Sequence, residues 1–120
     1  MITSKFFSES EFKRASPSGS LQNMKQSTMD RFDMARQYAG IPFVINSAFR
    51  SYEWERSKGR SGTGSHTLGQ ALDIRATNDR TRGKVLLGLI RAGFTRIGIA
   101  KTYIHADDSQ KHTQEVVWLY

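Results

Sequence analysis

The chain has 120 residues, which is enough for one compact domain and too few for two domains that each bury a core. It contains no cysteine, so disulfides, thiolate metal sites and a cysteine nucleophile are excluded. The net charge of +7, from 18 basic and 11 acidic residues, predicts attraction to polyanions. Because the basic residues are scattered without an interleaved aromatic ladder, we expect no specific nucleic-acid partner.

No apolar run approaches the roughly 20 residues that cross a bilayer, so we expect no membrane span. The amino terminus carries Lys5 and Glu9 early and has no apolar stretch of signal-peptide length, which predicts no export signal. We therefore expect synthesis in the cytoplasm and, for a target outside the membrane, delivery by another route. We also expect a monomer.

The first third of the chain contains the strongest helix signal. Residues 6–12 predict a short amphipathic element, and residues 15–20 predict a turn-rich connector. Ser20 suits a helix cap, residues 21–39 carry apolar side chains near the helical period, and Gly40 before a proline predicts the end of the helix. The apolar stripe predicts the face that packs on a sheet, and its members are Leu21, Met24, Thr28, Phe32 and Ala35.

The middle of the chain predicts two strands separated by a loop. Residues 43–47 read as a short strand, and residues 51–64 are polar and glycine-rich, which predicts a mobile loop. Residues 71–75 predict the next strand. Alternation places Leu72 and Ile74 on one face of that strand, opposite Ala71, Asp73 and Arg75.

The last third predicts one helix and three strands. Thr77 or Asn78 caps a helix that contains Val85, Leu86, Leu89 and Ile90 and ends at Gly93. Apolar runs at 95–100, 103–106 and 116–120 predict short strands. The order of elements predicts a single α+β domain over residues 1–120, with a mainly antiparallel sheet flanked by two or three helices.

Three side chains of the predicted domain are suitable ligands for a metal ion. His66 lies in a loop rich in small residues, and Asp73 is a carboxylate within an apolar strand, where burial without a cation is costly. Arg75 on the same face is the alternative partner of Asp73, as a salt bridge. His105 favours the metal, because alternation places it on the face of its strand opposite Ile104. Two imidazoles and a carboxylate are a ligand set for one catalytic Zn²⁺, although other divalent ions also accept it.

Other polar residues are candidates for the remaining roles in the site. His112 is kept as a reserve ligand. Asp107, two residues after His105 on the same strand face, is the predicted proton acceptor, with the alternative role of orienting a ligand imidazole. Arg50 at a strand end can offer its guanidinium to a substrate carboxylate or to a developing oxyanion. Alternative proton acceptors are Asp108, Glu53 and Glu55.

These residues resemble a known family, the zinc D-Ala-D-Ala carboxypeptidases and L-alanyl-D-glutamate endopeptidases that cut peptidoglycan stem peptides. The family signature S-x-H-x-x-G-x-A-x-D matches residues 64–73 at every fixed position but the first. Residues 47–51 resemble the arginine-bearing strand end, and residues 104–107 resemble the second histidine motif. The resemblance implies a fold shared with the hedgehog signalling domain, zinc bound by His66, Asp73 and His105, and a substrate held by Arg50.

The chain departs from the family pattern at two positions. Gly64 stands where the signature has serine. Thr102 stands three residues before the second histidine, where many members carry a glutamate or aspartate. The second departure leaves Asp107 as the replacement base, and the hedgehog domain illustrates that metal ligands alone do not guarantee turnover.

Three functions of different classes remain open. The first is a zinc metallopeptidase acting on peptidoglycan stem peptides, as an exopeptidase or an endopeptidase, with a bacteriophage lysis or entry enzyme as one setting. The second is a zinc-stabilised module that binds cell wall or a protein without cutting. A cationic nucleic-acid binder is a third interpretation. The choice between exopeptidase and endopeptidase depends on how residues 51–64 close the cleft.

Overall fold

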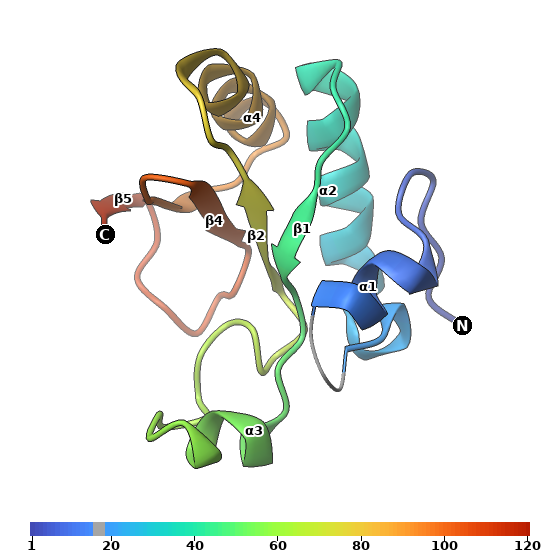
Figure 1. Cartoon of the computed structure of the whole chain (residues 1–120), viewed down its shortest axis with the longest axis vertical. Coiled ribbons are helices and arrows are strands. Elements are labelled where there is room, and N and C mark those ends of the chain that lie inside the picture. Colours follow the sequence, from blue (N-terminus) through green and yellow to red (C-terminus); the bar gives the residue numbers. More distant parts are fainter. Residues whose placement is uncertain (16–18) are drawn as a thin grey trace.

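A computed structural model describes residues 1–15 and 19–120, so part of the predicted connector at 15–20 lies outside the described residues. Figure 1 shows the arrangement of the elements. The helices are α1 (Glu9–Ala15), α2 (Gln26–Ala39), α3 (Tyr52–Ser57) and α4 (Asp79–Arg91), with a 3-10 turn, η1, at Leu21–Asn23. The strands are β1 (Ile45–Ser47), β2 (Ala71–Arg75), β3 (Arg96–Ile99), β4 (Tyr103–Asp107) and β5 (Val116–Leu119).

The strands form one five-stranded sheet in the order β1-β2-β4-β3-β5. The pairs β1–β2, β2–β4 and β3–β4 are antiparallel, and only β3–β5 is parallel. The predicted α+β fold with a mainly antiparallel sheet is therefore confirmed. None of the described helices is long and apolar enough to cross a bilayer.

The two faces of the sheet have different environments. Leu72 and Ile74 of β2 and Ile104 of β4 are fully buried in the core with residues of α2 and α4. Asp73 and His105 alternate with these residues and so lie on the opposite face. The helices therefore stabilise one face by apolar burial, while polar groups occupy the other.

Two local predictions were wrong. The helix predicted from residue 21 begins at Gln26, because Ser20 caps the 3-10 turn η1 and not α2. The loop predicted at 51–64 contains the helix α3. The Ser51 hydroxyl accepts a hydrogen bond from the Trp54 amide at 3.1 Å and so caps α3 at its amino end.

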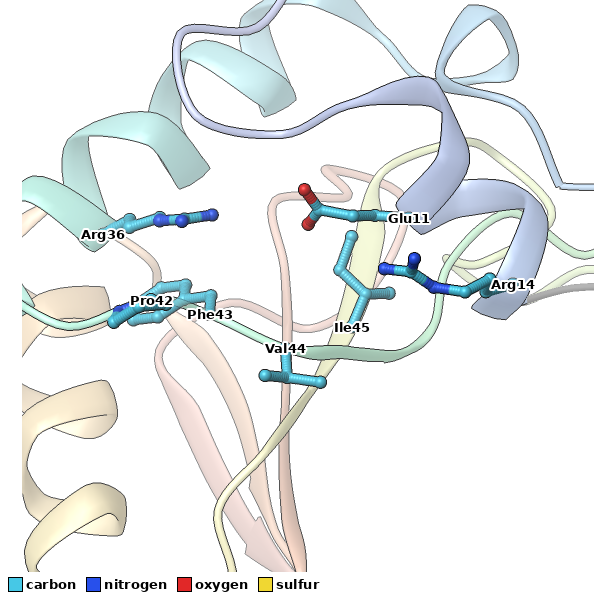
Figure 2. Close-up of a pocket in the computed structure, with 7 residues that line it drawn as sticks. All are labelled: Glu11, Arg14, Arg36, Pro42, Phe43, Val44 and Ile45. Atoms are coloured by element: carbon cyan, nitrogen blue, oxygen red, sulfur yellow. The ribbon is translucent and has the colours of Figure 1, made fainter.

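A surface hollow lies between α1, α2 and the segment that enters β1. Figure 2 shows Glu11 and Arg36 pointing toward one another across it. The Arg36 guanidinium also donates to the carbonyl of Phe6 at 3.3 Å. None of the residues that line the hollow is a predicted metal ligand; they are Glu11, Arg14, Arg36, Pro42, Phe43, Val44 and Ile45.

The α2–α4 contact depends on one glycine. A Cβ at Gly88 would lie 2.5 Å from the carbonyl oxygen of Ala35 and 2.9 Å from the Cβ of Ala39, both on α2. A Cβ at Gly83, also on α4, would meet nothing within 4 Å. The helices therefore approach each other closely at Gly88 and not at Gly83.

We predict opposite effects for alanine at these two positions. Gly88→Ala should lower the free energy of unfolding by about 1–3 kcal/mol, because overpacking against the α2 backbone exceeds the gain in helix propensity. Gly83→Ala should raise it by about 0.5–1 kcal/mol through propensity alone. Urea denaturation of both variants measures the difference, and equal stabilisation by the two changes would contradict the close approach.

Candidate metal centre

Three predicted ligands meet on the polar face of the sheet. Asp73 of β2 and His105 of β4 are partners in the antiparallel register, and Nδ1 of His105 lies 2.9 Å from Oδ1 of Asp73. Nε2 of His66, from the loop before β2, lies 3.1 Å from the same oxygen. Each residue offers one ligand atom, and these atoms lie within 4.8 Å of one another. That spacing allows a single ion to contact all three residues.

Backbone contacts fix His66 from both sides. The carbonyl of Ala48 accepts a hydrogen bond from Nδ1 of His66 at 2.7 Å. The carbonyl of His66 accepts from the amides of Gly69 at 3.2 Å and of Arg50 at 3.4 Å. The bond to Ala48 keeps a proton on Nδ1, so Nε2, on the side of Asp73, is the ring nitrogen that can bind a metal.

The turn after His66 requires a glycine at position 69. Its φ is +71°, in the left-handed region that favours glycine, and a Cβ there would collide with the carbonyl oxygen of Asn23 in η1. The Gly69 carbonyl also accepts from the Lys25 amide at 3.0 Å. Any side chain at this position would push the His66 turn away from η1.

Asp107 binds the far side of the His105 ring. Its Oδ2 lies 2.6 Å from Nε2 of His105, and its Oδ1 accepts from Nε of Arg96 at 2.8 Å and from the Ser109 amide at 3.2 Å. The Asp107 side chain is fully buried. A carboxylate that accepts from the remote nitrogen of a ligand imidazole orients the ring and raises its basicity.

The donor set fits zinc. Each imidazole has one nitrogen directed at Asp73 and its other nitrogen on an oxygen acceptor, Ala48 for His66 and Asp107 for His105. Both inward nitrogens are therefore available as ligands, with their orientation already set. Two imidazole nitrogens and one carboxylate oxygen leave a coordination position for water or substrate, as catalytic zinc sites do.

The titratable groups at this centre are strongly coupled. Burial raises the pKa of the Asp73 carboxyl, but hydrogen bonds from His105 and His66 outweigh it and hold that pKa well below its usual range. Burial lowers the pKa of His105, yet the hydrogen bonds to Asp107 and Asp73 raise it above its ordinary value. A metal ion must therefore displace a firmly held proton from His105.

Aromatic side chains of the carboxy-terminal segment pack near His105. Gly98 of β3 is the register partner of both His105 and Trp118, and a Cβ at Gly98 would overlap the rings of Trp118 and Tyr120. The Trp118 ring centre lies 5.4 Å from that of His105. The missing side chain at Gly98 thus allows Trp118 to lie across the sheet beside the ligand.

The other predicted residues lie outside the ligand group. His112 contacts the Ser109 hydroxyl at 2.8 Å and is not among the three grouped ligands. Arg75 is exposed, and in the described part of the chain Asp73 pairs with the two imidazoles. Thr102 is exposed in the β3–β4 turn, where its carbonyl accepts from the Ala76 amide at 2.9 Å.

The alternative proton acceptors have other partners or positions. Asp108 accepts from the Thr28 hydroxyl at 2.7 Å and lies 3.6 Å from Nε of Arg31. Glu55 is buried between two arginines, and Glu53 is exposed on α3. Asp107 faces Nε2 of His105 and not the metal-facing Nδ1, which favours the orienting role over proton transfer.

Two features of the site were not predicted from the sequence. Trp118 was predicted as part of a strand, but its position beside His105 was not; the signal was its alternation with Val117 and Leu119, which places it on the face of the sheet opposite theirs. The Ala48 carbonyl carried no signal, because a backbone acceptor for His66 depends on the fold alone.

A centre of two imidazoles and one carboxylate, on the sheet face opposite the one that packs on the helices, is typical of metal-dependent hydrolases. Residues 5–107 match the family described as Peptidase M15, and the chain therefore belongs to that family of zinc enzymes. The match includes all three ligand candidates and ends before Trp118. A comparison with curated proteins found no matching relative.

We predict that zinc affinity increases with pH. One proton displaced from His105 corresponds to about a tenfold tighter apparent binding per pH unit, until the pH exceeds the His105 pKa. Competition with a chromophoric chelator at pH 6 and pH 8 measures this, with His112→Ala as a control that should keep the same dependence. Equal affinity at both pH values would show that no proton is displaced.

Asp107→Asn separates the two roles considered for Asp107. If Asp107 orients His105, zinc affinity should fall about 10–100-fold, and activity should return at saturating zinc. If Asp107 instead accepts the proton during catalysis, zinc affinity should hold while kcat is lost. Calorimetric zinc titration together with kcat at saturating zinc distinguishes the outcomes, and Asp108→Asn is the neighbouring control.

Proposed function

We propose that this chain is a zinc-dependent peptidase that hydrolyses a peptide bond in peptidoglycan stem peptides. The observation that carries the proposal is the His66–Asp73–His105 group, whose ligand atoms lie within 4.8 Å of one another in a chain of the Peptidase M15 family. The signature around His66 and Asp73 supports the substrate class, through its resemblance to D-Ala-D-Ala carboxypeptidases and L-alanyl-D-glutamate endopeptidases.

The residues of the site have separate roles in this function. His66, Asp73 and His105 would hold one Zn²⁺, and the ion supplies Lewis acidity toward the scissile carbonyl and toward water. Asp107 holds the His105 ring so that Nδ1 faces the centre. Arg50 supplies a fixed positive charge for a substrate carboxylate.

The position of Arg50 supports this last assignment. Its amide donates to the carbonyl of His66, so its backbone is tied to the first ligand. Burial raises the pKa of Tyr103 and of Tyr120; the charge of Asp73 adds to this rise, and the charge of Arg50 opposes it. The backbone bond to His66 is therefore the contact that joins Arg50 to the metal centre.

A second function is a zinc-stabilised module that binds cell wall without cutting it. The observation that favours it is Thr102, which is exposed in the β3–β4 turn where many relatives of this type carry an acid. The carboxylates that could replace that acid are engaged elsewhere or exposed. We rank this function second, because a family of peptidases and a complete ligand set both favour turnover.

Delivery to the wall is part of the proposal. A bacteriophage lysis or entry enzyme is the setting that we favour, acting on the wall after synthesis in the cytoplasm. The support is the net charge of +7, which attracts a compact domain to an anionic wall.

Mass spectrometry of digested peptidoglycan tests the proposed activity. The zinc-loaded protein should release fragments with new amino termini or with terminal D-Ala removed, and His66→Ala should release none, because the ligand set is broken. His112→Ala should retain the activity, since His112 lies outside the ligand group. Unchanged fragments with several wall chemistries, from a protein that binds both zinc and wall, would instead support the binding module.

A further inference from the structure

A buried carboxylate joins two arginines beside the metal centre. Oε1 of Glu55 lies 3.0 Å from Nε of Arg50, and Oε2 of Glu55 lies 3.0 Å from Nη1 of Arg60. The Glu55 side chain is 7% exposed, whereas that of Arg60 is 52% exposed. Glu55 therefore lies inside the protein between an inner arginine and an outer one.

This cluster is anchored to the His66 loop through the backbone. Arg50 donates its amide to the carbonyl of His66, and its neighbour Ser51 caps α3. The first turn of α3 then brings Glu55 back toward the Arg50 side chain, with its amide on the carbonyl of Ser51 at 3.0 Å. In Figure 1, α3 lies at the bottom of the view, beyond the end of β1. The helix thus supplies a fixed support for an arginine that lies next to a metal ligand.

The way in which Glu55 binds Arg50 has a chemical consequence. A guanidinium has five N–H donors in one plane, and the ion pair with Glu55 is made at Nε, whose N–H is not aligned for a hydrogen bond. The end of the group, with its two Nη nitrogens, retains the geometry for a second, bidentate carboxylate. Two arginines and one glutamate also leave a net positive charge in the cluster, so a further anion is favoured there.

We propose that Glu55 is a positioning residue for substrate recognition, which holds the Arg50 guanidinium so that it binds a free carboxylate of the substrate. The inference rests on the proposed function, because it adds a recognition role to the same site. In this proposal, α3 sets the direction of the Arg50 side chain. Substrates whose carboxylates are amidated should lose this contact.

The competing explanation is that the ion pairs only hold residues 51–64 against the domain. In that case, loss of Glu55 would destabilise the protein and weaken all substrates equally. A positioning role instead changes the preference between a free carboxylate and its amide. The ratio of the two affinities therefore separates the explanations.

The test compares a stem pentapeptide that has all carboxylates free with the same peptide carrying a carboxy-terminal amide and D-isoglutamine. KM and kcat are measured for the zinc-loaded protein, and Kd is measured by calorimetry with the same peptides. The variants are Glu55→Gln and the control Glu53→Gln, which makes the same chemical change at an exposed position of α3. Singly amidated peptides then identify which carboxylate Arg50 binds.

We expect the unmodified protein to prefer the free peptide, and Glu55→Gln to lose about tenfold or more of that preference through KM and Kd, while kcat and zinc affinity change little. Glu53→Gln should keep the full preference. If Glu55→Gln does not fold, Glu55→Asp keeps the charge on a shorter side chain, and it should lose a smaller part of the preference.

Three results would overturn the inference: no preference in the unmodified protein, a preference unchanged in the Glu55 variants, or an equal loss for both peptides. Failure of the proposed function looks different. A protein that cleaves neither peptide but binds the free one better, in a manner that depends on Glu55, would retain the inference and refute the peptidase. Cleavage with a preference that does not depend on Glu55 would support the peptidase and refute the inference.

Discussion

The pairing of Asp73 with His105 across β2 and β4 is the constraint on which the metal centre depends. In an antiparallel sheet, directly opposed residues bring their side chains together on one face, and here that geometry places a carboxylate beside an imidazole. His66 joins them from the loop that leads into β2. A shift of one residue in this register would turn Asp73 or His105 toward the apolar core, so the fold and the site require the same alignment.

The division between the two faces of the sheet explains how a small domain supports a polar centre. Apolar side chains of β2, β3 and β4 pack against α2 and α4, and this burial stabilises the sheet. The opposite face can then hold two carboxylates, because both have partners: Asp73 has two imidazoles, and Asp107 has His105 and Arg96. Burial of these carboxylates is tolerated because their pKa values are lowered by the same contacts.

Alternation and spacing predicted the parts of the structure that depend on local sequence. The β2 strand and the face of Asp73 follow from the period of two. A cap at Thr77 or Asn78 follows from a side-chain oxygen before a helical pattern, and Asn78 is the residue that caps α4. Helix α3 was not predicted because it has six residues, and its ion pairs from Glu55 to Arg50 and Arg60 form only in the folded chain. The side of His105 that Asp107 faces was equally beyond prediction, since it depends on the orientation of the imidazole ring.

X-ray absorption at the zinc edge tests the central claim most directly. The account predicts one zinc per chain with two imidazole nitrogens at about 2.0–2.1 Å and carboxylate or water oxygens completing a light-atom shell. His66→Ala should remove one of the two imidazoles, and His112→Ala should remove none. A spectrum without imidazole scattering, or one that changes with His112 and not with His66, would contradict the metal centre and the function built on it.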